Sequence, residues 1–236
     1  MNNFNDFNNL KIEEFKKHPI IHNLVDWELL KETTKNQNIK LLDFIGKGHR
    51  GVVFKGLWYN NDNTKYQHIA LKVPRVNSKN TIINEATIMM ETNKFGVAPI
   101  VYNYSENFLM MELLEGVNLK DYLKQDNIDK RELLQIIRQT MKQCLKLDLH
   151  KIDHTEIQGG KHIIINRENN NVIVKLLDFD KAKKQNKPHN FTGAISLFYG
   201  KCYTSKKIKE ILNIPEKDYV VVRELLKIYK NTILKI

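Results

Sequence analysis

The sequence predicts an α+β protein of two lobes, with strands gathered in its first half and helices in its second. Between residues 39 and 114, short apolar or alternating segments follow one another, as expected of antiparallel strands. These segments are LLDFIG, VVFKGLWY, HIALKV, IVYNY and FLMMELL. After Gly116 the apolar residues mostly recur at helical spacing. A hinge over residues 113–116 would join the two lobes.

These patterns divide the chain into three segments. Residues 1–37 are polar and rich in asparagine, and we expect them to form an N-terminal helical extension. Residues 38–115 form the strand-rich N-lobe, and residues 116–236 form a reduced helical C-lobe.

Helical spacing and turn signals place the individual elements. Helices are predicted at residues 10–17, 20–33, 81–92, 119–124, 129–149 and 218–234. Two further strands, at residues 162–165 and 172–177, are separated by the turn NRENNN, and residues 60–64 are predicted to form a hairpin turn.

Composition sets wider limits on the function. The chain has 236 residues, of which 42% are apolar and 28% charged, an ordinary balance for a globular protein. It contains no apolar run long enough to span a bilayer, and its start does not resemble a signal peptide, so we expect a cytoplasmic protein without a transmembrane segment. The net charge of +11 suggests an anionic partner such as nucleotide phosphate, RNA or anionic lipid. A lysine-rich surface without any such partner explains the charge equally well.

The segment IGKGHRGVVF, at residues 45–54, contains the pattern GxGxxGxV. In dinucleotide-binding folds a glycine loop of this kind opens a helix. Here the following residues are β-branched and aromatic, so a strand is predicted instead, and this strand–loop–strand arrangement resembles the flap that protein kinases place over ATP. The resemblance implies that Gly46, Lys47, Gly48, Gly51 and Val53 bind the nucleotide, with Val53 against the adenine. A glycine-rich hairpin that binds nothing is the alternative.

The strand IALKV places Lys72 among apolar residues, and Ala70 precedes it on the same strand. A buried lysine is costly without an anionic partner. The expected partners are the phosphates of ATP and a glutamate of the next helix, for which Glu85 fits the pattern better than Glu91. The alternative is an edge-strand lysine that points to solvent.

The segment LMMELLEG, at residues 109–116, is similar to the strand-to-hinge segment of protein kinases. With the glycine loop, the strand lysine and the helix glutamate in the same order, residues 41–182 resemble the protein-kinase-like superfamily. The resemblance implies ATP and Mg²⁺ as cofactors and an unidentified acceptor that carries a hydroxyl group. It also implies that Met111 is the gatekeeper and that the backbones of Glu112 and Leu114 contact adenine.

The same resemblance places the catalytic loop at LHKIDHTEI, residues 149–157. His154-Thr155-Glu156 aligns with H-R-D, so Glu156 replaces the aspartate that accepts the proton, and Asp153 is a second candidate. The alternative is that both carboxylates merely cap the loop. Five residues past Glu156, Lys161 occupies the place of the metal-binding asparagine, so Lys161 or His162 would face the site and Lys161 could contact the γ-phosphate.

A strand then ends in Asp178-Phe179-Asp180, in place of D-F-G. Asp178 is the expected ligand of Mg²⁺, which prefers hard oxygen ligands. The continuation Asp180-Lys181-Ala182 resembles small atypical kinases, including Rio-type and lipopolysaccharide sugar kinases. The segment after Asp180 is too short for the activation segment and peptide-docking surface of ordinary protein kinases, so we expect a reduced substrate surface, as in Rio-type kinases and the small kinase of the KEOPS complex.

The sequence therefore predicts an ATP- and Mg²⁺-dependent phosphotransferase, either an atypical serine/threonine protein kinase or an autophosphorylating kinase. Two alternatives stay open. A pseudokinase, acting as a nucleotide-binding regulatory module, would explain the missing aspartate and asparagine. A Rio-like ATPase associated with RNA or ribosomes would explain the positive charge.

Overall fold

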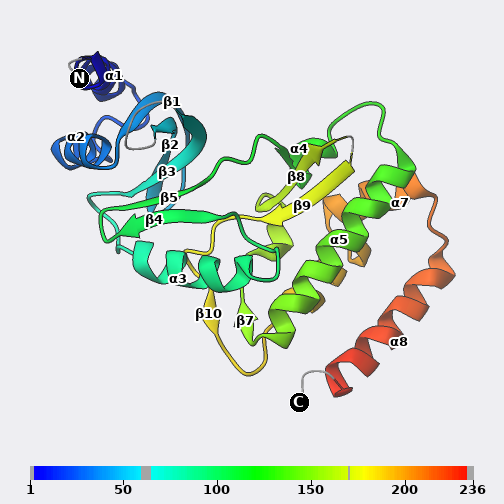
Figure 1. Ribbon diagram of the computed structural model, residues 1–236. Helices are drawn as coiled ribbons and strands as arrows, with labels where there is room; N and C mark the ends of the chain where they lie inside the picture. Colours follow the sequence, from blue (N-terminus) through cyan, green and yellow to red (C-terminus); the bar gives the residue numbers. More distant parts are fainter. Residues whose placement is uncertain (1–2, 60–64, 170, 233–236) are drawn as a thin grey trace. The chain divides into compact units, whose positions relative to one another are not determined.

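The computed structural model describes residues 3–59, 65–169 and 171–232 (Figure 1). The chain forms two compact units. The first contains Met1–Met90 and Pro99–Leu114, and the second contains Glu91–Ala98 and Glu115–Ile236. The fold is α+β, with the large sheet in the first unit and most of the helices in the second.

The first unit is built on one antiparallel sheet with the strand order β1-β2-β3-β5-β4. The strands are β1 (Ile39–Lys47), β2 (Gly51–Tyr59), β3 (Tyr66–Pro74), β4 (Val101–Ser105) and β5 (Phe108–Glu112). Each of the five segments predicted as strands coincides with one of them, which confirms the pattern. The hairpin turn predicted at residues 60–64 lies outside the described residues.

Two helices precede the sheet, α1 (Asn3–Lys16) and α2 (Trp27–Asn36). The helix predicted at residues 10–17 is too short, because α1 begins seven residues earlier. The helix predicted at residues 20–33 is wrong in its first part, where the chain forms turns. Asp26 sets the true start of α2, since its side chain accepts a hydrogen bond from the backbone NH of Leu29 at 3.0 Å.

Helix α1 covers the edge of the sheet through the buried side chain of Asn8. Its Nδ2 donates to the carbonyl of Ile39 at 2.8 Å, and its Oδ1 accepts from the NH of Leu41 at 2.9 Å. Backbone groups at a sheet edge otherwise stay unpaired and invite aggregation. Apolar residues of both helices then join those of the sheet in one core, including Ile12, Phe15, Leu30, Leu41 and Phe54.

Helix α3 (Ile82–Asn93) follows β3 and agrees with the helix predicted at residues 81–92. In the second unit, a three-stranded sheet has the order β6-β8-β9. Its strands are β6 (Val117–Asn118), β8 (Ile163–Glu168) and β9 (Asn171–Leu176), and a separate small pair joins β7 (Ile152–Asp153) to β10 (Lys183–Lys184). Both strands predicted in this region are therefore present.

Helix α5 (Lys130–Leu149) supports this sheet and matches its prediction closely. The side chains of Gln139 and Gln143 donate to the carbonyls of Val172 and Val174 in β9, so the helix and the strand are joined by polar bonds as well as apolar contacts. The short helix α4 (Leu119–Tyr122) and a 3₁₀ turn, η1 (Ile157–Gly159), complete the frame of the site.

Three helices end the second unit: α6 (Asn190–Tyr199), α7 (Tyr203–Leu212) and α8 (Glu216–Thr232). Of these, only α8 is predicted from the sequence, and its expected last residues, 233 and 234, lie outside the described part of the chain. Helix α6 has the sequence NFTGAISLFY, in which only Thr192 and Ser196 follow Asn190 as polar residues, too few to reveal helical spacing. Among the described residues, no helix is long and apolar enough to cross a membrane.

Candidate active site

The glycine-rich segment forms a tight connection between β1 and β2. The NH of Gly48 donates to the carbonyl of Gly51 at 2.8 Å, and β2 begins at Gly51. The structure thus confirms that a strand, and not a helix, follows the loop. A Cβ atom placed on Gly46 would meet nothing within 4 Å, and one on Gly48 would meet only the carbonyl of Gly51 at 3.7 Å.

The strand pairing gathers four predicted nucleotide-binding residues on one face of the first unit's sheet. Val53 pairs with Lys72, and Ala70 pairs with Met111. Directly opposed residues of antiparallel strands share a face, and so do residues two apart on one strand. Val53, Ala70, Lys72 and Met111 therefore line the same side of the sheet.

Lys72 places a buried charge on this face. It lies on β3, the middle strand, and its Nζ donates to Oε1 of Glu85 on α3 at 2.7 Å. The lysine side chain is 7% exposed and the glutamate side chain 1%. The alternative of an edge lysine that points to solvent is wrong. Glu91, the other glutamate considered, bonds to Lys184.

The closeness of Lys72 explains why a glycine occupies position 51. A Cβ atom at Gly51 would lie 2.7 Å from Cε of Lys72 and 3.1 Å from the carbonyl oxygen of Val73. A larger residue would have to displace the lysine stem or the neighbouring strand. The third glycine of the pattern therefore leaves room for the buried lysine.

The predicted hinge residues continue from β5. Glu112 ends the strand, and both its NH and its carboxylate bond to the backbone of Ile100, at 2.8 and 3.0 Å. Leu114 is half-buried and is the last residue of the first unit.

Arg75 is a functional candidate that the sequence patterns do not reveal. Its Nη1 donates to the carbonyl of His49 at 3.0 Å and lies 3.4 Å from that of Gly48, and its NH donates to the carbonyl of Arg50 at 3.0 Å. The segment after β3 thereby holds the tip of the glycine-rich loop.

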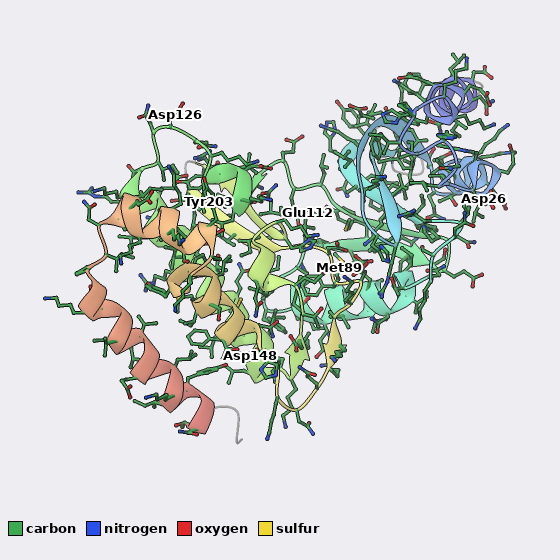
Figure 2. All side chains as sticks on the ribbon, turned by 180° about the vertical axis from the view of Figure 1, so that it is seen from behind. Asp26, Met89, Glu112, Asp126, Asp148 and Tyr203 are labelled. Atoms are coloured by element: carbon green, nitrogen blue, oxygen red, sulfur yellow. The ribbon has the colours of Figure 1, made fainter. Side chains whose placement is uncertain are left out.

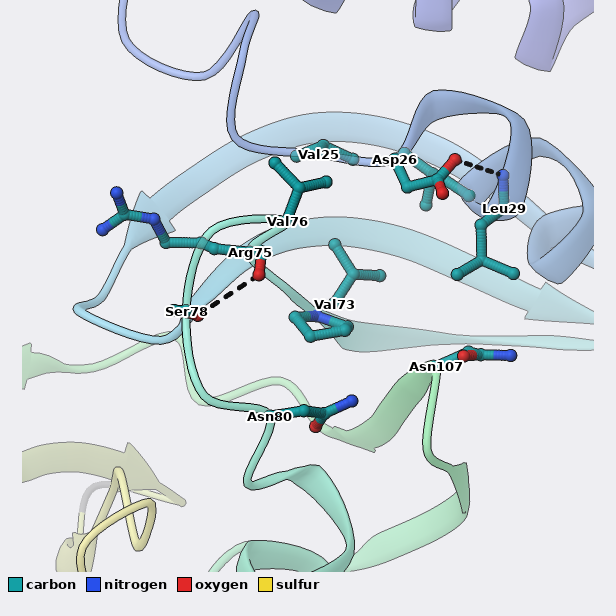
Figure 3. A pocket seen from close by; sticks show the side chains of 11 residues that line it. Val25, Asp26, Leu29, Val73, Arg75, Val76, Ser78, Asn80 and Asn107 are labelled. Atoms are coloured by element: carbon teal, nitrogen blue, oxygen red, sulfur yellow. Dashed lines mark hydrogen bonds between the residues drawn. The ribbon is translucent and has the colours of Figure 1, made fainter.

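Arg75 also lines a pocket of about 410 Å³ on the first unit (Figure 3). Val25, Asp26 and Leu29 come from the start of α2 and the residues before it. Asn80 precedes α3, and Asn107 lies between β4 and β5. Ser78 lines the pocket beside Arg75, and its Oγ donates to the carbonyl of Arg75 at 3.2 Å (Figure 3).

Replacing Arg75 by alanine is expected to loosen the glycine-rich loop. The loss of these hydrogen bonds removes about 1 kcal/mol, which corresponds to a rise of roughly fivefold in KM for ATP with little change in the melting temperature. Steady-state kinetics and thermal melting would measure both. Lys79→Ala, which removes an exposed positive charge from the same segment, is the matched control and should leave KM unchanged.

The second unit brings together Glu156, His162 and Asp178. His162 Nδ1 lies 3.7 Å from Oδ2 of Asp178, and its Nε2 lies 3.8 Å from Oε2 of Glu156. One nitrogen or oxygen from each of the three residues lies within 4.8 Å of the others. Lys161 is exposed, so the imidazole of His162, and not the amine of Lys161, stands between the two carboxylates.

Opposing effects set the protonation of this group. Burial alone would raise the pKa of Glu156, but the hydrogen bond from Lys181 at 2.9 Å and the charges of Lys181 and His162 outweigh it. The pKa of Glu156 is therefore lowered, and the carboxylate is ionised at neutral pH. Burial lowers the pKa of His162, against the attraction of Asp178. The imidazole is accordingly biased toward its neutral form.

Asp153, the second candidate base, is occupied elsewhere. One of its oxygens accepts the NH of Thr155 at 3.1 Å, and the other accepts the side-chain amide of Gln185. These contacts fit the loop-capping alternative. Glu156 makes no such cap at the start of η1.

The backbone has a positive φ at three positions of this region. Lys151 has a φ of 56°, Thr155 a φ of 70° and Asp178 a φ of 67°. Positive φ is rare for residues other than glycine and is costly for a β-branched residue such as threonine. Strain of this kind persists where the surroundings enforce it, and it concentrates at functional sites.

A buried polar network enforces this backbone. Asn190 Oδ1 accepts the NH of His154 at 2.8 Å, and its Nδ2 donates to Asp148 at 2.7 Å. Asp148, labelled in Figure 2, also accepts the hydroxyl of Tyr229 at 2.5 Å. The ring of His154 packs edge-on against Phe179 at 4.7 Å, and burial lowers the pKa of this histidine to about 4. The loop that contains His154 and Thr155 is thus anchored to α5, α6 and α8.

Comparison with known proteins agrees with this geometry. Residues 39–196 match the model of the protein tyrosine and serine/threonine kinase family. The match covers more than half of the chain and includes the glycine-rich loop, Lys72, Glu85, Glu156 and Asp178. The chain belongs to this family.

Several curated proteins are similar to the chain. An uncharacterized protein of Methanocaldococcus jannaschii, MJ1211, is 42% identical over 120 residues, which are 51% of this chain and 98% of that protein. The probable serine/threonine-protein kinase zyg-1 of Caenorhabditis briggsae is 27% identical over 64% of the chain and 21% of that kinase. The probable serine/threonine-protein kinase fnkE of Dictyostelium discoideum is 25% identical over 80% of the chain and 16% of that kinase. The chain therefore corresponds to a small part of each of these two kinases.

Proposed function

We propose that this protein is an ATP- and Mg²⁺-dependent phosphotransferase that transfers the γ-phosphoryl group to a hydroxyl, as an atypical serine/threonine protein kinase. The single observation that carries the proposal is the buried ion pair of Lys72 and Glu85. A buried ion pair contributes little to stability compared with apolar residues of the same size, so stability is a poor explanation for it. Holding an amine toward nucleotide phosphate is a better one.

The sheet face described above supports binding of the nucleotide. Val53, Ala70 and Met111 offer apolar surface for an adenine ring beside the amine of Lys72. The open space at Gly46 and Gly48 allows phosphate to approach the backbone. We assign Lys47, Glu112 and Leu114 to the same nucleotide site on the strength of their places in the sequence.

Asp178 is the proposed Mg²⁺ ligand, and its surroundings suit a cation. Its side chain is 26% exposed, Glu156 adds a second carboxylate nearby, and His162 Nε2 is a buried nitrogen without a hydrogen-bond partner among the described residues. When bound, Mg²⁺ would neutralise charge on the phosphates. The proposal requires Lys72 and Asp178 to serve the same triphosphate.

Glu156 is the proposed base that orients the acceptor hydroxyl. It is ionised, it belongs to the same cluster as Asp178, and it is not used to cap the loop. Lys181 holds one of its oxygens in place. The acceptor itself, whether protein side chain or small alcohol, is left open by this assignment.

The two candidate bases predict different mutants. Glu156→Gln is expected to lower kcat roughly a hundredfold or more, because the amide cannot take a proton, while ATP affinity is retained. Asp153→Asn is the matched control and should reduce kcat far less, with its main effect on the melting temperature through the loop. If Asp153→Asn were the variant that lost kcat while folding normally, the roles would have to be exchanged.

A pseudokinase is the second candidate, and the Glu156–Lys181 ion pair favours it. Among the described residues, the cluster contains two carboxylates, Glu156 and Asp178. Lys181 engages one oxygen of Glu156, the carboxylate proposed as the base. If the pair persisted with ATP bound, the base would be partly blocked. An RNA-associated ATPase is supported by the net charge alone.

Incubation with ATP labelled at the γ-phosphate separates these functions. The proposal predicts labelled protein or labelled acceptor that depends on divalent metal. Release of free phosphate without labelled product would indicate an ATPase. Intact ATP that binds without turnover would establish a pseudokinase and overturn the proposal.

A further inference from the structure

The cluster in the second unit contains a feature that magnesium chemistry does not explain. His162 directly precedes β8, and its side chain is 10% exposed. Nε2 is buried and has no hydrogen-bond partner within the described residues. Leaving a buried polar nitrogen unpaired is costly, so its placement calls for a ligand near the ring or a hydrogen-bond acceptor that moves toward Nε2.

The two ring nitrogens face different carboxylates. Nδ1 faces Asp178 at 3.7 Å, and Nε2 faces Glu156 at 3.8 Å. Two ligands that each lie about 2.1 Å from one cation are separated by about 3.0 Å at right angles and about 4.2 Å in opposite positions. The spacing of Nδ1 and Asp178 Oδ2 falls between these limits.

Metal preference follows from the donor atoms. Mg²⁺ takes oxygen ligands almost exclusively and retains much of its water. Imidazole nitrogen favours first-row transition metals, whereas carboxylate oxygen is shared by Mg²⁺ and Mn²⁺. A histidine beside an aspartate therefore discriminates against Mg²⁺ in a way that two oxygen donors do not.

We propose that His162 and Asp178 together bind the divalent cation, with Nδ1 as the imidazole ligand, and that this pair selects Mn²⁺ over Mg²⁺. Nε2–H then points to Glu156 Oε2, 3.8 Å away, and closing this gap to hydrogen-bond distance on metal binding would fix the tautomer of the ring, as carboxylates commonly do for metal-bound histidines. Lys181 holds the other oxygen of Glu156 at 2.9 Å. The role of the bound metal in phosphoryl transfer rests on the proposed function. The binding of the metal by His162 and Asp178 does not.

The competing explanation is a purely internal one. A protonated His162 could bridge the two carboxylates and balance their charge without any metal. Such a ring would donate from both nitrogens, and added metal would have to displace its proton and would gain nothing from the imidazole.

Binding of Mn²⁺ to the nucleotide-free protein, followed by electron paramagnetic resonance with Mg²⁺ as competitor, tests the proposal. The wild-type chain is expected to bind one Mn²⁺ and to keep it against an excess of Mg²⁺. His162→Asn should lower Mn²⁺ affinity roughly tenfold or more while Mg²⁺ affinity is retained, so that the preference disappears. Asp178→Asn should abolish binding of both metals.

Glu156→Gln is the matched control, because its amide oxygen can still accept from Nε2–H. It should weaken binding without removing the preference for Mn²⁺. Thermal melting of each variant checks that the fold is kept. An unchanged ratio of Mn²⁺ to Mg²⁺ affinity in His162→Asn, or no Mn²⁺ bound by the wild type, would overturn the proposal.

These results are independent of phosphoryl transfer. Binding of ATP and transfer of its γ-phosphate are measured separately on the same samples. A chain that selects Mn²⁺ through His162 but transfers nothing would refute the proposed function and leave the metal inference standing. Metal-dependent transfer by a chain whose ratio of Mn²⁺ to Mg²⁺ affinity is the same in wild type and His162→Asn would refute the metal inference and leave the proposed function standing.

Discussion

Lys72→Ala is expected to abolish phosphoryl transfer and, at the same time, to destabilise the first unit. Transfer should fall by at least about a hundredfold, because the amine that stabilises phosphate charge is removed. Stability should also fall by about 3–5 kcal/mol, since Glu85 is left as a buried charge with a side chain that is 1% exposed. The burial of the pair is therefore the reason to expect a loss of stability along with the loss of transfer.

A double variant separates the two effects. Lys72→Met combined with Glu85→Leu replaces the buried pair with apolar residues of similar size and should recover much of the lost stability. Transfer should stay as low as in the single variant. Chemical denaturation and γ-phosphate labelling at one temperature provide both measurements. Recovery of transfer along with stability would mean that Lys72 serves the fold and not the reaction.

Asp178→Asn is expected to abolish metal-dependent transfer while the fold is kept. The substitution preserves side-chain size, and Asp178 is 26% exposed, so the change in melting temperature should be small. Loss of the charge removes a hard anionic ligand, and transfer should fall by at least about a hundredfold. Labelling with γ-phosphate over a range of metal concentrations, with thermal melting beside it, would measure this.

Asp180, two residues after Asp178, provides a control for this prediction. Asp180 is buried at 4% exposure, so Asp180→Asn should act mainly on stability. If Asp178→Asn kept full transfer at low metal concentration, the metal would have to be held elsewhere.

Much of the first unit follows from sequence because its signals are local. Strand alternation places Lys72 and Val53, and pairing across antiparallel strands puts both on one face. A lysine inside an apolar strand requires a nearby anion, so the sequence alone points to the partnership with Glu85.

The second unit is harder to predict because its site depends on loops. Counting residues from Glu156 selects Lys161, yet His162 is the residue that lies between the carboxylates, and its place is fixed by the start of β8 at Ile163. Helix α6 is missed because its ten residues contain few polar side chains to mark a helical face. Its residue Asn190, which anchors His154, therefore has no sequence signal that separates it from an ordinary surface asparagine.

Arg75 shows the same limit in the first unit. Its hydrogen bonds go to backbone carbonyls of the glycine-rich loop, and such bonds place no constraint on the identity of the loop residues. Sequence patterns describe side chains, so they do not reveal that Arg75 binds backbone carbonyls.

A crystal structure of the protein with a non-hydrolysable ATP analogue and Mn²⁺ tests the central claim most directly. The account predicts one nucleotide whose phosphates lie within hydrogen-bond distance of Lys72 Nζ, with the metal on these phosphates bound by Asp178. A nucleotide that contacts one of these residues and leaves the other without any role in phosphate or metal binding would contradict it.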